Sequence, residues 1–411
     1  MNRVAVTGMG IISPLGQDVA SFWQALTEGQ CGIGPLTRFD VSDYKVKIAA
    51  EVKGFDPSQH GMDVGDARRM DLFTQYAMAA AHQAMAQSGL MGQVAPERLG
   101  VNVSSGIGGI ETFYRESIKL SQRGPSRVSP LCIPMMIGNM AAGNVAIRYN
   151  AQGACMPIVT ACASSTHSVG EAYRQIRHGY LDAVITGGSE ASVTPIAVAG
   201  FTSSMALSEA NEPLRSSMPF DLHRGGFVLG EGAGVLVLEN YEHAKARGAR
   251  ILGEVVGFGT TCDAHHITAP HPEGLGAARA IALAMDEAGA QAQEAVYINA
   301  HGTGTPLNDK TETLAIKTAL GEERARKAAV SSIKGAIGHM LGAAGAAELI
   351  ATLKALETGV LPPTIPLITP DPACDLDYVP HKARAWQADL GVSISLGFGG
   401  HNGAVAVRRG A

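Results

Sequence analysis

The chain has 411 residues, of which 46% are apolar and 17% charged, a balance typical of globular proteins that argues against disorder. The net charge of −5 argues against a nucleic-acid binder, which usually carries a basic domain. No apolar run approaches the roughly 18 residues that a membrane span needs, so we expect no membrane association.

Short apolar runs alternate with longer segments of helical periodicity, which predicts an α/β fold whose sheets are covered by helices. The predicted strands are residues 4–7, 99–103, 157–160, 183–186, 235–238, 296–300, 330–332 and 392–395. The predicted helices are residues 73–87, 163–178, 276–288, 310–320 and 343–356. The first strand begins without a signal-peptide layout, so we expect a cytoplasmic protein.

The chain resembles itself weakly in three places. Residues 4–13 resemble residues 253–262, and residues 101–108 resemble residues 296–303. A strand, a turn and a helix ending in glycine occur at 157–179 and again at 330–359. This order predicts a duplication, with one α/β half at residues 1–250 and the other at 251–411. Chance similarity between small-residue turns is the alternative.

The first turn with chemical potential is Val159-Thr-Ala-Cys-Ala-Ser-Ser165, which places Cys162 between a predicted strand and a predicted helix. The N–H groups at a helix N-terminus favour a thiolate and can also bind an oxyanion. None of the six cysteines forms a Cys-x-x-Cys pair, which argues against a zinc ribbon or a thioredoxin-type site and favours reduced thiols. Position alone leaves a small buried hydrophobe as the alternative for Cys162.

Two further turns carry histidines. His301 follows a predicted strand, at the edge where α/β folds bind ligands. His339 also follows a strand, and we expect it to match Cys162 in the other half. Lys334 lies in an apolar stretch and needs a partner, for which Glu348 is the candidate. Alone, a surface position for each of these groups is the alternative.

The fourth turn is Leu396-Gly-Phe-Gly-Gly-His-Asn-Gly403, in which the glycines indicate close approach to a ligand. It does not fit a dinucleotide fingerprint, because Asn402 stands where the third glycine belongs. The pair Gly8 and Gly10 fails in the same way, with Ser13 at that position. A Rossmann oxidoreductase is therefore disfavoured.

Four motifs together are specific: TACASS at 160–165, NAHGTGTPLND at 299–309, SSIKGAIGHMLGAAG at 331–345 and GFGGHNG at 397–403. They resemble those of the β-ketoacyl-[acyl-carrier-protein] synthases, the condensing enzymes of fatty acid synthesis, and most closely the bacterial type II enzymes that elongate medium and long acyl chains. The likeness spans nearly the whole chain. It implies a thiolase-like fold of two pseudo-symmetric α/β halves with a five-layered αβαβα core.

The resemblance also implies the chemistry: a decarboxylating Claisen condensation that lengthens an acyl chain on a carrier protein by two carbons. Cys162 would be the nucleophile, and His301 and His339 would serve decarboxylation. Relatives that start chains carry Asn at the position of His339, and chain-length-factor relatives lack the cysteine. This sequence therefore resembles an elongating, catalytic member. No metal or other cofactor is implied, because phosphopantetheine belongs to the carrier protein.

Further roles follow from the same resemblance. Lys334 with Glu348 would orient the histidines, Thr303 and Thr305 would bind the pantetheine arm, and the N–H groups of Cys162 and Phe398 would hold the oxyanion. The resemblance assigns the remaining residues to a gate (Phe398), the substrate loop (Gly399), the acyl tunnel (Ile107, Phe201), support (Asp309, Glu312) and carrier-protein docking (Arg68, Arg69, Arg127). Plain core packing is the alternative for the two tunnel residues.

Some positions differ from the family pattern. Residues that are basic in many relatives are neutral here at Gly65 and Met205, and His401 stands where many carry Thr. A homodimer is implied by the family. The functional alternatives are a ketosynthase of a type II polyketide or aryl-polyene pathway working with a pairing subunit, a non-catalytic pairing subunit, and a Cys-His hydrolase.

Overall fold

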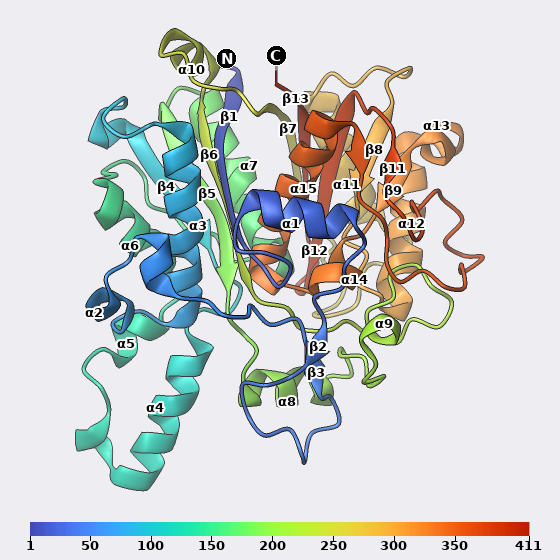
Figure 1. The fold of residues 1–411 in the computed structure, drawn as a ribbon. Helices are drawn as coiled ribbons and strands as arrows, with labels where there is room; N and C mark the ends of the chain where they lie inside the picture. Colours follow the sequence, from blue (N-terminus) through green and yellow to red (C-terminus); the bar gives the residue numbers. More distant parts are fainter. Residues whose placement is uncertain (411) are drawn as a thin grey trace.

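The computed structural model describes residues 1–410, which form a nine-stranded mixed sheet in the order β4-β5-β6-β1-β7-β13-β12-β8-β9 (Figure 1). The two central strands, β1 (Val4–Ile12) and β7 (Gly253–Cys262), pair over only three residues of β1, Val4 to Val6, and then separate. The sheet is therefore two half-sheets joined at one seam. The others are β4 (Leu99–Ser104), β5 (Ala183–Glu190), β6 (Gly232–Asn240), β8 (Val296–Asn299), β9 (Ala329–Ser331), β12 (Leu390–Gly397) and β13 (His401–Arg409).

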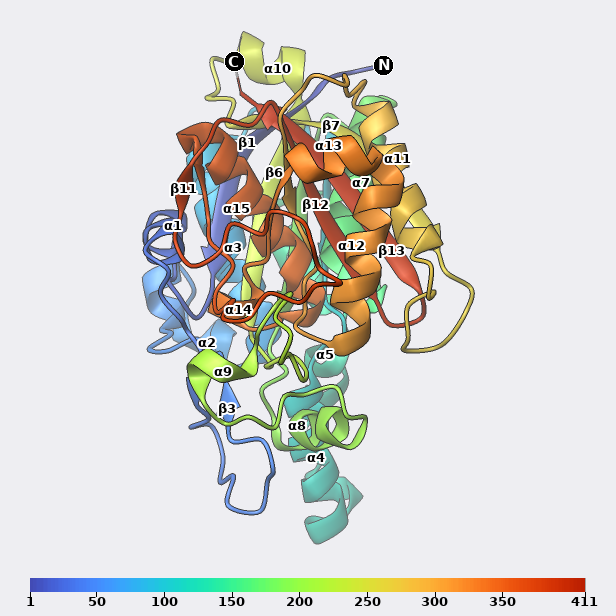
Figure 2. The same ribbon diagram turned by 90° about the vertical axis from the view of Figure 1, so that its right-hand side faces the viewer.

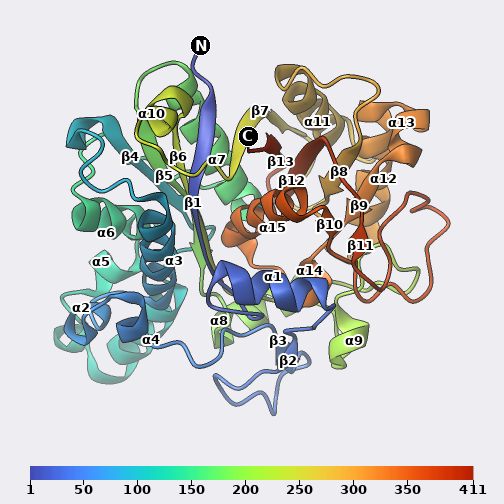
Figure 3. The same ribbon diagram turned by 45° about the horizontal axis from the view of Figure 1, so that its top comes forward.

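Helices occupy three layers around the two half-sheets (Figures 1 and 3). α7 (Ser164–Arg177) and α15 (Ala344–Thr358) lie between the half-sheets and share one apolar core with both. α3 (Leu72–Ser88) and α6 (Met140–Tyr149) cover the outer face of the first half-sheet. α11 (Leu275–Glu287) and α12 (Pro306–Leu320) cover the outer face of the second. The five layers agree with the expected αβαβα arrangement.

The same helix-on-strand contact occurs once in each half, at the glycines of the repeated segments. A Cβ at Gly8 or Gly10 of β1 would lie 2.0 Å from a carbonyl oxygen of α3. A Cβ at Gly257 or Gly259 of β7 would lie 2.0 or 1.9 Å from a carbonyl oxygen of α11. The repeat seen in the sequence therefore reflects close approach of a helix to a strand. The boundary near residue 250 stays a prediction.

One predicted strand is absent, and two observed strands of the nine-stranded sheet were not predicted. Residues 157–160 form no strand: a bridge joins Val101 to Cys155 just before this segment, and Pro157 then lacks the N–H that a ladder needs. β7 was not among the predicted strands, and neither was β13. Its small residues Gly403-Ala-Val-Ala-Val407 are buried and carry no alternation of polar and apolar side chains. Most other strands extend beyond the predicted ranges, as β1 does.

Smaller elements complete the chain, and α4 and α8 project together from one end of the molecule (Figure 2). The helices are α1 (Val19–Thr27), α2 (Val64–Ala67), α4 (Ile110–Arg123), α5 (Cys132–Met136), α8 (Pro195–Ser203), α9 (Pro213–Ser216), α10 (Tyr241–Ala246), α13 (Glu322–Lys327) and α14 (Lys334–Ile337). The short strands are β2 (Gly34–Pro35), β3 (Ile48–Ala49), β10 (Val360–Leu361) and β11 (Arg384–Ala385). Within residues 1–410, no helix has both the length and the apolar character to cross a membrane.

The close packing of β7 on α11 predicts a large stability cost for Gly259→Ala. The added methyl group would clash with the Ala280 carbonyl oxygen, since their separation would be 1.9 Å. Overpacking of this kind costs about 1–3 kcal/mol or more, measured as the free energy of unfolding in urea. Gly200→Ala in α8 is the matched control: its Cβ meets nothing within 4 Å, so it should keep or slightly raise stability. Equal effects of the two substitutions would contradict this account.

Candidate active site

A cavity of about 350 Å³ brings the predicted reactive residues together. Cys162, His301 and His339 all line it, although they are far apart in the chain. His301 follows β8 at its carboxyl end, where α/β folds place ligand sites. Cys162 lies in the turn before α7, and His339 follows α14. The wall also includes Phe201, Thr303, Thr305 and Phe398.

Cys162 lies in a strained turn that leads directly into α7. The turn is a 3₁₀ segment, Ala161–Ala163, and Ala161 has φ +50°, a left-handed conformation that is costly for a residue with a side chain. The second half repeats the geometry: Leu341 has φ +47° and α15 begins at Ala344. The counterpart of Cys162 is thus Gly342. The expectation that His339 matches Cys162 is wrong, because His339 stands three residues before Gly342.

The environment of Cys162 opposes ionisation of its thiol. Burial raises its pKa to about 12, while the Lys334 cation and the Phe398 N–H lower it. The glycine loop approaches this turn closely, since a Cβ at Gly397 would lie 2.6 Å from the Thr160 carbonyl oxygen. Burial therefore outweighs the favourable position at a helix N-terminus, and the resting form is the thiol.

The two histidines face each other. Their ring centroids are 5.3 Å apart with an interplanar angle of 82°, and both side chains are buried. Burial, assisted by the Lys334 cation, lowers the pKa of both His301 and His339 well below the ordinary value, so both rings are neutral. The Leu341 N–H donates to His339 Nδ1 at 3.2 Å, so Nε2 of that ring carries the proton.

His301 differs from its neighbour in one respect. Within residues 1–410 its Nδ1 atom has no hydrogen-bond partner, although the ring is buried. Its backbone N–H donates to Glu312 Oε1 at 2.6 Å, which fixes the residue at the end of β8. Leaving this buried nitrogen unpaired costs free energy, and its missing partner leaves the protonated nitrogen of His301 unassigned, in contrast to His339.

Lys334 and Glu348 form a fully buried ion pair behind the histidines. The Lys334 ammonium contacts Glu348 Oε1 and donates to the His301 carbonyl oxygen at 2.5 Å. Both side chains are 0% exposed. The partner proposed for Lys334 from the sequence is therefore the one that the structure provides. The pair links α14, α15 and the His301 loop, and it places a cation beside the reactive groups.

Two more carboxylates hold the loop from His301 to Asp309. Glu312 accepts from the Gly302 N–H at 2.8 Å, and burial raises its pKa to about 7. Asp309 accepts from the N–H groups of Gly304 at 3.2 Å and Phe220 at 2.7 Å. The Thr303 and Thr305 hydroxyls lie 2.9 Å apart on the cavity side of this loop. The two carboxylates thus hold the backbone of the loop, and the loop presents the Thr303 and Thr305 hydroxyls to the cavity.

Sequence reasoning missed Glu190, a fully buried carboxylate at the end of β5. It accepts from the Ser105 hydroxyl at 2.8 Å, the Gly106 N–H at 2.9 Å and the Gly342 N–H at 3.0 Å. It therefore ties the Ile107 loop to the turn before α15. The only sequence signal for Glu190 was a single acidic residue after the predicted strand at residues 183–186.

The remaining predicted residues lie around the cavity or away from it. Gly399 has φ +89° and donates to the Ile267 carbonyl oxygen at 2.7 Å, which joins the glycine loop to the loop after β7. Ile107 does not line the cavity and is 41% exposed.

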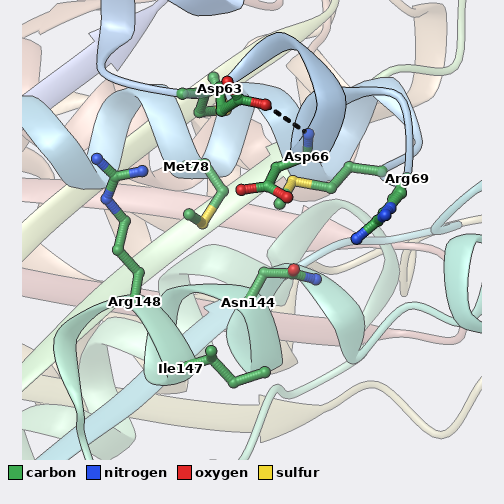
Figure 4. Close-up of a pocket in the computed structure, with 9 residues that line it drawn as sticks. Asp63, Asp66, Arg69, Met78, Asn144, Ile147 and Arg148 are labelled. Carbon is green, nitrogen blue, oxygen red and sulfur yellow. Dashed lines mark hydrogen bonds between the residues drawn. The ribbon is translucent and has the colours of Figure 1, made fainter.

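The arginines assigned to docking are surface residues outside this cavity. Arg68, Arg69 and Arg127 are all exposed. Arg69 lines a separate cavity of about 390 Å³, and Asp63, Asp66 and Arg148 also line this cavity (Figure 4). The acidic side chains there offset the arginines, so this cavity is not a simple basic patch.

Two family models cover most of the chain. Residues 1–244 match the Beta-ketoacyl synthase, N-terminal domain, and residues 252–367 match the Beta-ketoacyl synthase, C-terminal domain. The chain belongs to the beta-ketoacyl synthase family. The Cys162 turn lies in the first matched region, and both cavity histidines lie in the second.

Relatives match this beta-ketoacyl synthase over nearly its full length. A 3-oxoacyl-[acyl-carrier-protein] synthase 2 from Synechocystis sp. is 49% identical over 409 residues, which cover 99% of this chain and 98% of the relative. A protein of the same name from Staphylococcus aureus is 47% identical over 408 residues, again with 99% and 98% coverage.

Solved structures share the fold over 100% of both chains. A beta-ketoacyl synthase from Burkholderia phymatum superposes with TM-score 0.92 at 35% identity. The ishigamide ketosynthase/chain length factor gives the same values. A type II polyketide ketosynthase in complex with its acyl-carrier protein has TM-score 0.91 at 31% identity. The thiolase-like fold expected from the sequence is confirmed.

The buried ion pair predicts an asymmetric response to substitution. Glu348→Gln leaves the Lys334 cation buried without its counter-charge, and breaking such a pair costs about 3–5 kcal/mol of unfolding free energy. The double variant Lys334→Met/Glu348→Leu should recover most of that loss. Glu323→Gln, which removes one partner of an exposed pair with Lys327, is the control and should leave stability unchanged. A Glu348→Gln variant as stable as the control would contradict the account.

Proposed function

We propose that this protein catalyses the decarboxylating Claisen condensation of fatty acid synthesis, in which a malonyl group on acyl carrier protein extends a Cys162-bound acyl chain. The observation that carries the proposal is the convergence of one thiol and two neutral imidazoles on a single cavity. The relatives named 3-oxoacyl-[acyl-carrier-protein] synthase 2, at 47–49% identity over nearly the whole chain, support the same reaction.

In the first half-reaction, the Cys162 sulfur attacks the thioester of an acyl chain on the carrier. The thiol proton leaves during the attack and ends on the departing carrier sulfur, because burial disfavours the free thiolate. The N–H groups of Cys162 and Phe398 would hold the tetrahedral oxyanion, and each such donor is worth about 10²–10³ in rate. The carrier thiol departs, and the enzyme is acylated.

In the second half-reaction, the malonyl thioester loses CO₂ and becomes an enolate. His339 offers an Nε2–H to the developing negative oxygen, and His301 offers a second donor. Neutral rings suit this role, since each keeps one N–H while its other nitrogen accepts or stays free. The enolate carbon then attacks the acyl-Cys162 carbonyl, the bond from that carbonyl carbon to the Cys162 sulfur breaks, and the sulfur takes up a proton. The product on the carrier is a 3-oxoacyl chain two carbons longer.

Surrounding residues would support both steps. Lys334, held by Glu348, lowers the pKa of Cys162 and of both histidines without transferring a proton. Thr303 and Thr305 would bind the pantetheine arm. Phe398, 37% exposed at the cavity mouth, would move as a gate once the enzyme is acylated.

The acyl carrier protein is the proposed partner, and its phosphopantetheine is the only prosthetic group that the reaction needs. The type II polyketide ketosynthase at 31% identity is recorded in complex with its carrier protein, which supports this partnership. Arg68, Arg69 and Arg127 are exposed and suit an acidic partner. We propose the cytoplasm as the location, in keeping with the proposed reaction of fatty acid synthesis.

A polyketide or aryl-polyene ketosynthase that works with a pairing subunit is the second candidate. The ishigamide ketosynthase/chain length factor and the type II polyketide ketosynthase share 35% and 31% identity with this chain. These values are below the 47–49% of the two relatives named 3-oxoacyl-[acyl-carrier-protein] synthase 2. The fatty acid role is therefore the better supported of the two.

The decisive experiment follows the mass of the intact protein after mixing with acyl carrier protein that bears an acyl chain. The wild type should gain one acyl group, and added malonyl carrier should then yield a product two carbons longer. Cys162→Ala should gain nothing, whereas Cys262→Ala, which removes another cysteine at the glycine loop, should behave as the wild type. Release of free acid alone would indicate a hydrolase, and activity only with an added pairing subunit would indicate the polyketide role.

We also propose a homodimer, supported by an exposed apolar segment beside the edge strand β4. In that segment Met156 is 53% and Val159 60% exposed, and Ile133 of α5 is 58% exposed. Exposed apolar patches of this kind favour association with a second copy.

The exposed apolar segment around Val159 predicts that a charge placed there will prevent dimer formation. Val159→Asp should convert the dimer to a monomer in sedimentation analysis, because a carboxylate would be buried without a partner. Leu283→Asp changes another exposed apolar residue, 48% exposed on α11, and should leave the mass unchanged. A monomeric wild type, or a dimer that survives Val159→Asp, would refute the proposed interface.

A further inference from the structure

The strained turn that carries Cys162 is held mainly through Thr160. The Thr160 N–H donates to the Ser164 hydroxyl at 2.9 Å, and its carbonyl oxygen accepts from the Ala163 N–H at 3.1 Å. Its own hydroxyl lies 2.6 Å from His167 Nδ1. A non-glycine residue stays at a positive φ, as Ala161 does, only where its surroundings over-determine it.

His167 joins this turn to the segment that follows the glycine loop. It lies on α7 and is 5% exposed. Its Nε2 atom lies 3.3 Å from the Asn402 carbonyl oxygen and 2.9 Å from the Thr260 hydroxyl. One imidazole thus bridges the Thr160 side chain of the Cys162 turn and the β12–β13 hairpin that carries Phe398.

The protonation of His167 follows from these partners. A carbonyl oxygen only accepts, so Nε2 carries the proton and Nδ1 accepts from the Thr160 hydroxyl. Burial lowers the pKa of His167 to about 4, so the ring keeps this neutral form at physiological pH. The two hydrogen bonds of His167 therefore keep the same donors and acceptors at physiological pH.

Neighbouring residues pack closely around the His167 ring. A Cβ at Gly403 would lie 3.3 Å from His167 Nε2. The Phe258 ring stands edge-on to the imidazole, with centroids 6.0 Å apart. A second link between the helix and the hairpin, from the Thr166 hydroxyl to the Ser395 hydroxyl at 2.7 Å, does not touch Thr160 or the glycine loop.

We infer that His167 is a positioning residue that sets the Cys162 N–H and the Phe398 N–H relative to each other, so that both point at one oxyanion. The two amides belong to segments more than two hundred residues apart, and His167 contacts both segments. The inference rests on the proposed condensation, because it concerns the oxyanion of the acylation step. In this account His167 affects the acylation step, whereas His301 and His339 serve the decarboxylation step.

Three rates test it on the full-length protein: acylation of Cys162 by an acyl carrier protein, alkylation of Cys162 by iodoacetamide, and CO₂ release from malonyl carrier without an acyl donor. Alkylation forms no oxyanion, and decarboxylation uses His301 and His339. His167→Leu and the near-isosteric Thr160→Val should slow acylation about a hundredfold, the typical effect of losing one oxyanion donor. Alkylation and decarboxylation should keep the wild-type rates.

Two threonine variants serve as controls. Thr166→Val removes the Thr166–Ser395 hydrogen bond from the same helix and hairpin and should leave all three rates unchanged. Thr260→Val leaves the Asn402 contact of His167 in place, so its acylation rate should fall less than that of Thr160→Val.

The outcomes separate the two proposals. Wild-type acylation rates in both His167→Leu and Thr160→Val would overturn the inference, as would acylation and alkylation that fall together, since that pattern marks general damage to the turn. If His167→Leu does not fold, Thr160→Val decides alone. A wild type that fails to acylate or to extend the chain would refute the proposed function itself.

Discussion

Two helices, α7 and α15, lie between the half-sheets of this protein, and that position requires small side chains at the points where the helices meet each other or a strand. A Cβ at Gly345 of α15 would lie 1.9 Å from the Thr166 hydroxyl oxygen of α7, and one at Gly170 would lie 2.3 Å from the Phe258 ring. The backbones approach closely only because these residues are small. With the helices packed so tightly, their N-terminal turns meet, and the cavity forms where they meet.

The same burial determines the chemistry of the site. It keeps the thiol protonated and both imidazoles neutral, because a low-dielectric interior disfavours the charged form of each group. The Lys334 cation is tolerated there because Glu348 and the His301 carbonyl oxygen surround it. The neutral histidines can then donate hydrogen bonds to a negative oxygen without themselves carrying charge.

The two halves share a frame but differ in their reactive turns. Both have a left-handed residue, a 3₁₀ segment and a helix, at Ala161 and at Leu341. The first half places Cys162 after the left-handed residue, whereas the second places Gly342 there and supplies His339 three positions earlier. Glu190 and His167 join these turns to other segments, which makes the site a product of both halves.

The sequence alone determined the family and the α/β character, and it picked out three residues that line one cavity, because glycine-rich turns of this kind are local and specific when they occur together. Residue patterns also pointed to Glu348 as the partner of Lys334. Tertiary structure alone decided that residues 157–160 form no strand, that β13 completes the sheet, and that Cys162 corresponds to Gly342. It also decided the pKa directions and the bridge through His167. These features depend on contacts between segments distant in the chain, and no local pattern of residues encodes such contacts.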